Sequence, residues 1–267
     1  MYDIAVAGGG PAGLAAAIHA RARDKNVVVL SGEPTASPLC KAKRVDNYPG
    51  LPQADGKALV ESFVEQARTL GAQFKLGRIL NVMANKSGFM LSVGPDIVEA
   101  RAVILATGVE RAAKLPGEAE LLGRGVSYCA TCDGMLYRGR QVAVAGDAPD
   151  LEEETAFLEK IGCTVIRVPL AGLKILGEGR VEAVESKAGR VPCEGVFLLR
   201  RSVALSDLLP ALETENGSIK TDRFMRTNLP RVYAAGDCTG APLQIAKAVG
   251  EGQMAAHSAC QDLETEG

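Results

Sequence analysis

Short runs of apolar residues recur along the chain, each bounded by glycine or by polar residues. Apolar runs of this length that lack alternation predict strands buried on both faces, as in parallel sheets. The first two runs occupy residues 3–7 and 27–30, and an Ala-rich apolar helix is expected between them at residues 14–22. A strand, a helix and a second strand in this order predict a βαβ unit at the start of the chain.

The pattern changes after this unit. Residues 56–70 carry apolar side chains on one helical face, which predicts an amphipathic helix. Alternating stretches at residues 79–82 and 89–93 predict a small β-meander. A buried strand is expected again at residues 102–108.

A second βαβ unit is predicted in the middle of the chain. It consists of a strand at residues 141–145, a helix at 151–161 and a strand at 164–168. Further strands are expected at 181–186, 195–199 and 232–236, and a closing helix at 244–262. With 267 residues, this order of elements indicates an α/β protein of one large or two modest domains.

The loop after the first strand is rich in glycine. It reads Gly8, Gly9, Gly10, Pro11, Ala12 and Gly13. A G-x-G-x-x-G sequence between a strand and a helix is typical of a dinucleotide-binding loop, in which the helix N-terminus donates N–H groups to a pyrophosphate. Glu33, which follows Gly32 near the end of the second strand, is a candidate for holding a ribose hydroxyl. The structural alternative is a glycine-rich loop that only packs.

The corresponding loop of the second βαβ unit is poor for phosphate binding. Gly146 occupies the first glycine position of the fingerprint, but Ala148 and Leu151 occupy the other two. Asp147 and Asp150 would lie near the helix N-terminus and repel a pyrophosphate. Loops without the fingerprint can still bind phosphate, so this pattern alone does not exclude a nucleotide.

A Cys-x-x-Cys pair, Cys129 and Cys132, is followed at once by Asp133. One thiolate of such a pair can attack an external disulfide and the other can resolve the mixed disulfide. Asp133 is close enough in sequence to serve as an acid or base. Zinc binding is the alternative, but it needs four ligands. The remaining cysteines are Cys40, Cys163, Cys193, Cys238 and Cys260. They form no second pair and there are only two histidines, so no metal site is expected.

Composition narrows the choice of partners and location. A hydrophobic content of 47% and a charged content of 23% are ordinary for a soluble globular protein. The net charge of −2 and the absence of tryptophan speak against nucleic acid or anionic membranes as partners. No signal peptide or membrane-spanning run is visible, and the odd cysteine count fits a reducing compartment. We therefore expect a cytoplasmic protein.

Taken in order, the motifs resemble those of the low-molecular-weight thioredoxin reductases. The matching segments are GGGPAG at 8–13, DNYPG at 46–50, ATG at 106–108, CATCDG at 129–134 and AAGD at 234–237. The resemblance implies an α/β fold of two Rossmann-like, three-layer ββα domains. The FAD domain would be discontinuous, at residues 1–113 and 226–267. An inserted domain of the pyridine-nucleotide type, at 114–225, would carry the redox pair.

The resemblance also implies the roles of individual residues. The FAD-binding set would comprise Gly8, Gly9, Gly10, Pro11, Ala12, Gly13, Gly32, Glu33, Asn47, Thr107, Gly108, Gly236, Asp237, Gln244 and Ile245. Asn47 and Gln244 would approach the flavin end. Cys132 would face the flavin, Cys129 would attack the thioredoxin disulfide, and Asp133 would act as acid or base. Members of the family are usually homodimers that switch between two domain orientations.

Departures from the family concern the donor of electrons. Besides the altered loop at 146–151, Val-Pro-Leu follows Arg167 where family members carry arginines for NADPH. The inserted domain is also shorter than usual. A subgroup of the family takes electrons from reduced ferredoxin, and a flavin suits that role because it accepts electrons singly and passes on two. Lys41, Lys43 and Arg44 form a basic run that could meet an acidic ferredoxin.

We therefore expect a flavin thioredoxin reductase with ferredoxin as donor and thioredoxin as acceptor. Three alternatives stay open at this point. The first is an NADPH-dependent thioredoxin reductase with an atypical nucleotide loop. The second is a relative with another small donor, or with a partner such as a peroxiredoxin. The third is a flavin-bound redox sensor in which the cysteine pair is a switch.

Overall fold

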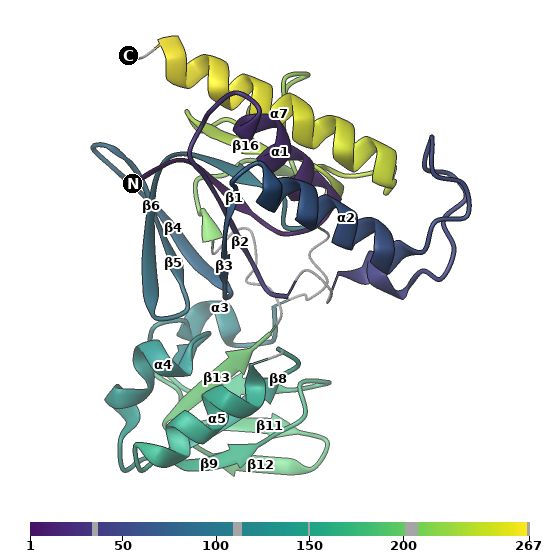
Figure 1. Ribbon diagram of the computed structural model, residues 1–267. Helices are drawn as coiled ribbons and strands as arrows, with labels where there is room; N and C mark the ends of the chain where they lie inside the picture. Colours follow the sequence, from purple (N-terminus) through teal and green to yellow (C-terminus); the bar gives the residue numbers. More distant parts are fainter. Residues whose placement is uncertain (34–36, 109–113, 149, 201–207, 266–267) are drawn as a thin grey trace. The chain divides into compact units, whose positions relative to one another are not determined.

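The structure, a computed structural model, describes residues 1–33, 37–108, 114–148, 150–200 and 208–265 and divides into two units (Figure 1). The first unit combines both ends of the chain, Met1–Glu110 and Leu205–Gly267, and the second comprises Arg111–Ala204. The chain was expected to return to the first domain at residue 226. It returns earlier because Leu208, Leu212 and Ile219 are buried in the apolar core of the first unit.

A seven-stranded sheet forms the centre of the first unit. Its strands are β1 (Tyr2–Ala7), β2 (Val27–Ser31), β3 (Gln73–Leu76), β4 (Ile79–Asn85), β5 (Gly88–Val93), β6 (Asp96–Leu105) and β16 (Val232–Ala234). Parallel pairing joins β3, β2, β1, β6 and β16 in that order. Because these strands are parallel, their carboxyl ends meet at one edge of the sheet, which is where ligands bind in open α/β sheets.

Strand β6 pairs with different strands along its length. Its N-terminal half pairs antiparallel with β5, from Phe89 opposite Ala100 to Val93 opposite Asp96. Its C-terminal half pairs parallel with β16. The strand was predicted to begin at residue 102, but β6 begins at Asp96. Its first half is more polar and pairs with β5, so the apolar pattern marked only its second half.

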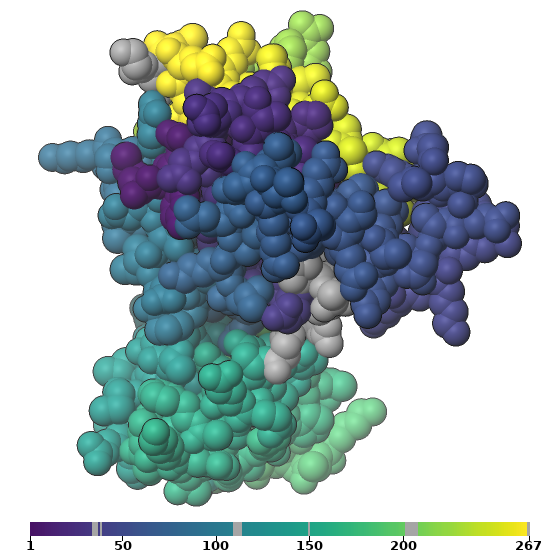
Figure 2. Space-filling view, viewed as in Figure 1, coloured from purple at the N-terminus to yellow at the C-terminus, as the bar shows by residue number. Residues whose placement is uncertain are grey.

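Three helices cover one face of this sheet: α1 (Pro11–Arg21), α2 (Gly56–Thr69) and α7 (Ile245–Thr265). Figure 2 shows the atoms of α7, in yellow, against those of the first residues of the chain, in purple. Gly252 makes this approach possible, because a Cβ on it would lie 2.1 Å from the Ala12 carbonyl oxygen. The side chains on the other face belong to a second apolar core, which includes Phe89 and Leu91 of β5.

Short elements complete the first unit. They are the 3-10 helices η2 (Pro38–Lys41) and η4 (Asp237–Thr239) and the hairpin of β14 (Thr214–Glu215) with β15 (Ser218–Ile219). Within the described residues, no helix is long and apolar enough to cross a membrane.

The second unit repeats the layered plan at smaller size. Its parallel sheet has the order β7 (Val126–Ser127), β13 (Gly195–Leu199), β8 (Gln141–Gly146) and β9 (Thr164–Arg167). The helix α5 (Leu151–Lys160) packs beside β9. An antiparallel meander consists of β10 (Lys174–Leu176), β11 (Ala183–Ser186) and β12 (Gly189–Pro192). The described residues of this unit also form three short helices: α3 (Glu118–Leu121), α4 (Ala130–Asp133) and η3 (Gly134–Tyr137).

Most predicted elements are confirmed, with shifted ends. The first helix begins at Pro11 and not at residue 14, because proline is favoured in the first helical turn. The strand expected at 181–186 begins at Ala183. The strands β10 and β12 were not predicted, since each is short and partly exposed and carries a weak apolar pattern.

Candidate cofactor and redox sites

The glycine-rich loop forms a tight turn between β1 and α1. Gly8 has a φ of +124°, and a Cβ on it would lie 2.1 Å from the Ala106 carbonyl oxygen. A Cβ on Gly13 would lie 1.9 Å from the Gly8 carbonyl oxygen. Both positions therefore require glycine, the first for the backbone conformation and both for the close packing of strand, loop and helix.

The space in front of this loop is open. A Cβ on Gly10, Gly32 or Gly108 would meet no atom within 4 Å. The helix α1 has no acidic residue in its first turn, so the positive end of its dipole is not neutralised by a carboxylate. An open space at such a helix end fits the pyrophosphate of a dinucleotide such as FAD.

Three further loops converge on the same edge of the sheet. Ala7 pairs with Leu30 and with Leu105, and Leu105 pairs in turn with Ala234. The segments that follow these strands therefore lie near the glycine-rich loop. They are Gly32 with Glu33 after β2, Thr107 with Gly108 after β6, and Gly236 with Asp237 after β16. The structure thus brings most of the predicted FAD-binding residues together.

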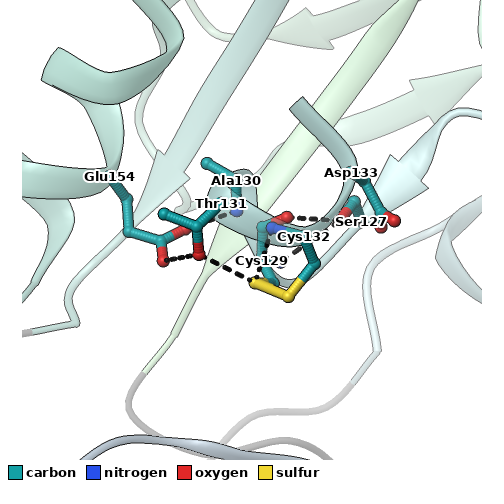
Figure 3. Close-up of a disulfide and its surroundings, with 7 residues drawn as sticks. All are labelled: Ser127, Cys129, Ala130, Thr131, Cys132, Asp133 and Glu154. Atoms are coloured by element: carbon teal, nitrogen blue, oxygen red, sulfur yellow. Dashed lines mark hydrogen bonds between the residues drawn. A yellow bond between two sulfur atoms is a disulfide. The ribbon is translucent and has the colours of Figure 1, made fainter. Parts of the chain in front are cut away.

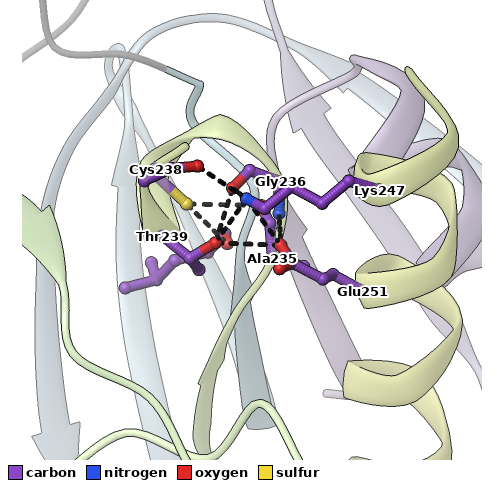
Figure 4. Close-up of polar contacts among 8 residues, drawn as sticks. Ala235, Gly236, Cys238, Thr239, Lys247 and Glu251 are labelled. Carbon is purple, nitrogen blue, oxygen red and sulfur yellow. Dashed lines mark hydrogen bonds and ion pairs between the residues drawn. The ribbon is translucent and has the colours of Figure 1, made fainter. Parts of the chain in front are cut away.

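The loop after β16 is held by a lysine from α7 (Figure 4). Lys247 Nζ donates to the carbonyl oxygens of Gly236 at 2.9 Å and Gly240 at 2.7 Å, and lies 2.9 Å from Thr239 Oγ1. Glu251 Oε2 lies 3.1 Å from Lys247 Nζ and accepts the Gly236 N–H at 2.9 Å. These contacts fix the turn that presents Asp237.

Asn47 and Gln244 meet although they are far apart in the sequence. Asn47 Nδ2 donates to Gln244 Oε1 at 2.7 Å, and both side chains are exposed. Ile245 follows as the first residue of α7. Among the basic residues nearby, Lys41 and Lys43 are exposed, whereas the Arg44 guanidinium is paired with Asp46 at 2.9 Å.

In the second unit, Cys129 and Cys132 form a disulfide at the start of α4 (Figure 3). Their Cα atoms are 5.3 Å apart. The Cys132 N–H points to Cys129 Sγ, with a nitrogen–sulfur distance of 3.1 Å. Cys129 is only 4% exposed, whereas Cys132 lies on the surface. The two sulfurs thus have different environments, which is the arrangement expected for a pair with divided roles.

Asp133 lies close to the pair but is bound by a neighbouring hydroxyl. The Ser127 hydroxyl donates to Asp133 Oδ2 at 2.6 Å, and Ser127 Oγ accepts the Cys129 N–H at 3.2 Å. Asp133 also affects Tyr137: burial raises the pKa of this phenol, and the Asp133 charge raises it further. The carboxylate is therefore near the redox pair, with Ser127 between it and the Cys129 backbone.

A second carboxylate reaches the same helix from α5. Glu154, 6% exposed, accepts the Ala130 N–H in a short hydrogen bond and the Thr131 hydroxyl at 3.3 Å. Thr131 Oγ1 lies 3.3 Å from Cys129 Sγ. Figure 3 shows these groups in one row, from Glu154 through Thr131 to the disulfide. The sequence analysis assigned no role to Ser127, Thr131 or Glu154.

The loop between β8 and α5 is closed against β13. The Asp147 and Ala148 N–H groups both donate to the Leu199 carbonyl oxygen at 3.0 Å. A Cβ on Gly146 would lie 1.9 Å from this same oxygen. A phosphate-binding loop presents its N–H groups to the ligand, whereas here two of them are used inside the protein.

Acidic residues surround the start of α5. Glu152, Glu153 and Glu154 occupy its first turn. The Arg167 side chain forms a two-armed ion pair with Glu152, which lowers the pKa of the glutamate and raises that of the arginine. The start of α5 therefore carries negative charge, and the Arg167 guanidinium is paired with a carboxylate of the protein.

A buried ion pair lies beyond the end of β13. The Arg200 guanidinium donates to both Glu118 carboxylate oxygens, at 3.1 and 2.7 Å, and the Tyr128 hydroxyl donates to Glu118 Oε1 at 3.0 Å. No local sequence signal indicated this pair, since its members are far apart in the chain. Charged and hydrogen-bonded groups therefore occupy this edge of the sheet.

Of the five cysteines outside the pair, Cys163, Cys193, Cys238 and Cys260 are buried and Cys40 is half-buried. Desolvation raises the pKa of Cys193 and of Cys238 to about 11 in each case. Burial also lowers the pKa of His19, and the Arg23 charge contributes to the shift. The Cys193 and Cys238 thiols are therefore protonated near neutral pH, and neither supplies a thiolate for redox chemistry there.

The chain matches the pyridine nucleotide-disulphide oxidoreductase family over residues 2–170 and 173–252. It is 31% identical to a thioredoxin reductase of Listeria monocytogenes, over 99% of this chain and 94% of that protein. A ferredoxin-flavin thioredoxin reductase of Clostridium acetobutylicum is similar in structure, with a TM-score of 0.92 and 35% identity over 99% of this chain and 98% of that one. A thioredoxin reductase of Gloeobacter violaceus has a TM-score of 0.83 and 31% identity, over 99% of this chain and 95% of that one.

Proposed function

We infer the electron donor and acceptor of this chain from its family: it belongs to the pyridine nucleotide-disulphide oxidoreductases and, among them, to the low-molecular-weight thioredoxin reductases, which are FAD flavoproteins. From this membership we propose that it takes electrons from reduced ferredoxin and passes them through FAD and the Cys129–Cys132 pair to thioredoxin.

The preference for ferredoxin over NADPH rests on the β8–α5 loop. Its Asp147 and Ala148 N–H groups bind the Leu199 carbonyl oxygen, and the first turn of α5 carries three glutamates. A nucleotide phosphate would have to break these hydrogen bonds and approach a negative helix end. The likeness to the Clostridium acetobutylicum protein named as a ferredoxin-flavin enzyme supports the same choice of donor.

The first unit supplies the residues for FAD. Gly8–Gly13 would receive the pyrophosphate at the start of α1, and Asp237 would hold the middle of the cofactor in the turn fixed by Lys247. Asn47 and Gln244 would approach the flavin end as a hydrogen-bonded pair. When bound, FAD supplies the chemistry that converts single electrons from a one-electron donor into a pair for a disulfide.

The two cysteines would have different roles in electron transfer from FAD to thioredoxin. Cys132 is exposed and would receive the electron pair, whereas Cys129 would attack the thioredoxin disulfide. Cys129 is buried in the oxidised structure, so its attack requires that the sulfur becomes accessible. Asp133 lies at this end of α4, where its carboxylate accepts the Ser127 hydroxyl, and would serve there as acid or base.

Two features of assembly belong to the proposal. Ferredoxin would dock beside the flavin end. Lys41 and Lys43, which precede Asn47 by a few residues in the sequence, are exposed and could meet its acidic surface. The protein would also act as a homodimer, which sedimentation at several concentrations would test.

Anaerobic reduction of the bound flavin tests the choice of donor. Bleaching of the visible flavin band by reduced ferredoxin, and not by NADPH or NADH, followed by thioredoxin reduction that needs both cysteines, is the expected result. Fast and saturable bleaching by NADPH would contradict the proposal. It would show instead an NADPH-dependent enzyme whose β8–α5 loop opens to bind the nucleotide.

A further inference from the structure

Two carboxylates stand near Cys129, and their hydrogen bonds differ. The Asp133 carboxylate accepts the Ser127 hydroxyl at 2.6 Å, and Ser127 leads to the Cys129 backbone and not to a sulfur. The Glu154 carboxylate accepts the Thr131 hydroxyl at 3.3 Å, and Thr131 Oγ1 lies 3.3 Å from Cys129 Sγ. Among the contacts of the described residues, Glu154 is therefore the carboxylate that is connected to Cys129 Sγ through a hydroxyl.

Glu154 is held in place for this contact. It lies in the first turn of α5, is buried, and also accepts the Ala130 N–H from α4. A buried carboxylate with two hydrogen-bond donors has a defined position, and a hydroxyl between an acid and a thiol can pass a proton in either direction. Ser127 offers no such path for Asp133, because its hydroxyl is bound to the peptide backbone on the other side.

We propose that Glu154, acting through the Thr131 hydroxyl, holds and receives the Cys129 proton during exchange with the partner disulfide. Thr131 touches the reacting sulfur, and Glu154 is a positioning residue that acts through it. The inference rests on the proposed function for its biological meaning, but it concerns the protonation of one thiol and can be measured without any electron donor or thioredoxin.

The exchange balances with this assignment. The Cys129 Sγ proton passes to Thr131 Oγ1 while the Thr131 hydroxyl proton passes to Glu154. The Cys129 thiolate then attacks the partner disulfide, forms a mixed disulfide and releases one partner sulfur as a thiolate. Cys132 next attacks Cys129 Sγ, re-forms the disulfide and releases the second partner sulfur. The two protons lost by the cysteines are taken up by the two partner sulfurs, and one electron pair is transferred.

Other titratable groups face this end of α4 as well. Cys132 and Asp133 lie on α4 itself, Tyr137 follows on η3, and Glu154 comes from α5. Glu153 is the neighbour of Glu154 in the sequence but is exposed. Only Glu154 is connected to Cys129 Sγ by a hydrogen-bonded hydroxyl, within the contacts of the described residues.

Charge determines the direction in which Glu154 shifts the pKa of the Cys129 thiol. While Glu154 stays ionised, loss of the Cys129 proton to solvent would place a second negative charge beside it. The thiol that donates to Thr131 is therefore favoured until the proton passes to Glu154 itself. Removing the Glu154 charge, or the hydroxyl that carries its influence, should therefore lower the pH at which Cys129 ionises.

The test measures that pH directly. In a Cys132→Ser background of the full, FAD-loaded chain, the rate of Cys129 alkylation by iodoacetamide is followed against pH, with peptide mass spectrometry to separate Cys129 from the other cysteines. We expect Glu154→Gln to lower the midpoint by about one pH unit, a roughly tenfold rise in thiolate fraction below the midpoint. Glu153→Gln removes the same charge from the exposed neighbouring position and should leave the midpoint unchanged.

Substitutions of Thr131 show whether the influence passes through the hydroxyl. Thr131→Val should also lower the midpoint, Thr131→Ser should retain it, and Glu154→Gln should add little to Thr131→Val. Because serine keeps the hydroxyl and valine lacks it, these two variants test the role of the hydroxyl even if Glu154→Gln fails to fold. An unchanged midpoint in Glu154→Gln, a rise in Thr131→Val, full additivity of the two changes, or an equal shift in Asp133→Asn would each overturn the proposal. Failure of the ferredoxin proposal would appear in flavin bleaching and leave these midpoints unaffected.

Discussion

Arg167 and Glu152 form a two-armed ion pair across the start of α5, with Nη1–Oε1 and Nη2–Oε2 distances of 2.5 and 2.6 Å. Arg167 is the last residue of β9, the position after which a 2′-phosphate would be bound in a nucleotide-binding unit. The side chain that could recognise such a phosphate is therefore directed to a carboxylate of the protein itself.

The first prediction concerns pyridine nucleotides. NADPH or 2′,5′-ADP should not raise the melting temperature of the protein, because the Asp147 and Ala148 N–H groups are bound to Leu199. Glu152→Gln frees Arg167 but leaves these N–H groups unavailable, so it should not create nucleotide binding either. A melting temperature that rises with nucleotide concentration would contradict this expectation.

Lys247 should stabilise the turn that we propose to hold FAD. Lys247→Met removes its hydrogen bonds to Gly236 and Gly240 and leaves Glu251 without its cation, at side chains that are 16% and 20% exposed. We expect a loss of about 1–3 kcal/mol in the free energy of unfolding and weaker retention of FAD. Denaturant unfolding and the flavin-to-protein absorbance ratio measure the two effects.

The matched control for this change is another Lys–Glu pair with the same spacing. Lys57 and Glu61 face each other on α2 at 3.7 Å, but their side chains are 58% and 54% exposed. Lys57→Met should therefore change stability by less than about 0.5 kcal/mol and leave FAD content unaltered. Equal effects in the two variants would mean that burial of the Lys247 contacts has no energetic consequence.

Acid should weaken the attachment of α7. Hydrogen bonds from the Arg226 guanidinium hold the pKa of Asp262 below its usual value, and the Tyr233 hydroxyl contributes to the same shift. A lowered pKa in the folded state means that this stabilisation is present above the unfolded value and is lost as pH falls through the folded value. Asp262→Asn should lower the melting temperature at neutral pH and make less difference below about pH 4.

The control for this pH dependence is Glu264 on the same helix. Its pKa is also lowered, by the Lys25 side chain, but the carboxylate is exposed. Glu264→Gln should have a smaller effect at neutral pH, because solvent screens the pair. A melting temperature that does not depend on Asp262 at neutral pH would show that the Arg226 contact adds nothing to stability.

The two cysteines should behave differently in trapping experiments. Cys132→Ser should form a stable mixed disulfide with oxidised thioredoxin through Cys129, because no second thiol remains to resolve it. Cys129→Ser should not. Mass spectrometry of the linked peptides identifies the attacking sulfur, and a stable adduct in Cys129→Ser would reverse the proposed roles.

Charge reversal should identify the ferredoxin surface. Lys41→Glu and Lys43→Glu in one variant should raise the KM for reduced ferredoxin several-fold and reduce the effect of ionic strength on the rate. Reversal of Lys174, an exposed residue in the other unit, is the control. An unchanged KM in the double variant would exclude these lysines from docking.

Local sequence sufficed where the structure depends on neighbours in the chain. The turn at Gly8–Gly13 was predicted because its glycines are required by backbone conformation and by strand–helix packing over a few residues. The redox pair was predicted because only two residues separate its thiols, and the structure joins them in a disulfide. The strand order of the sheet and the meeting of Asn47 with Gln244 could be expected only through the family resemblance.

The amino-acid sequence by itself determined the two βαβ units, the glycine-rich loop, the cysteine pair and the weakness of the second phosphate loop. The side chains and carbonyl groups that contact the cysteine pair and the β8–α5 loop became visible only in the tertiary structure. Glu154 comes to Ala130 and Thr131 from another helix, and Leu199 comes to Asp147 from another strand. Such partners are chosen by the packing of elements that are distant in the chain, and no pattern within a single element encodes them.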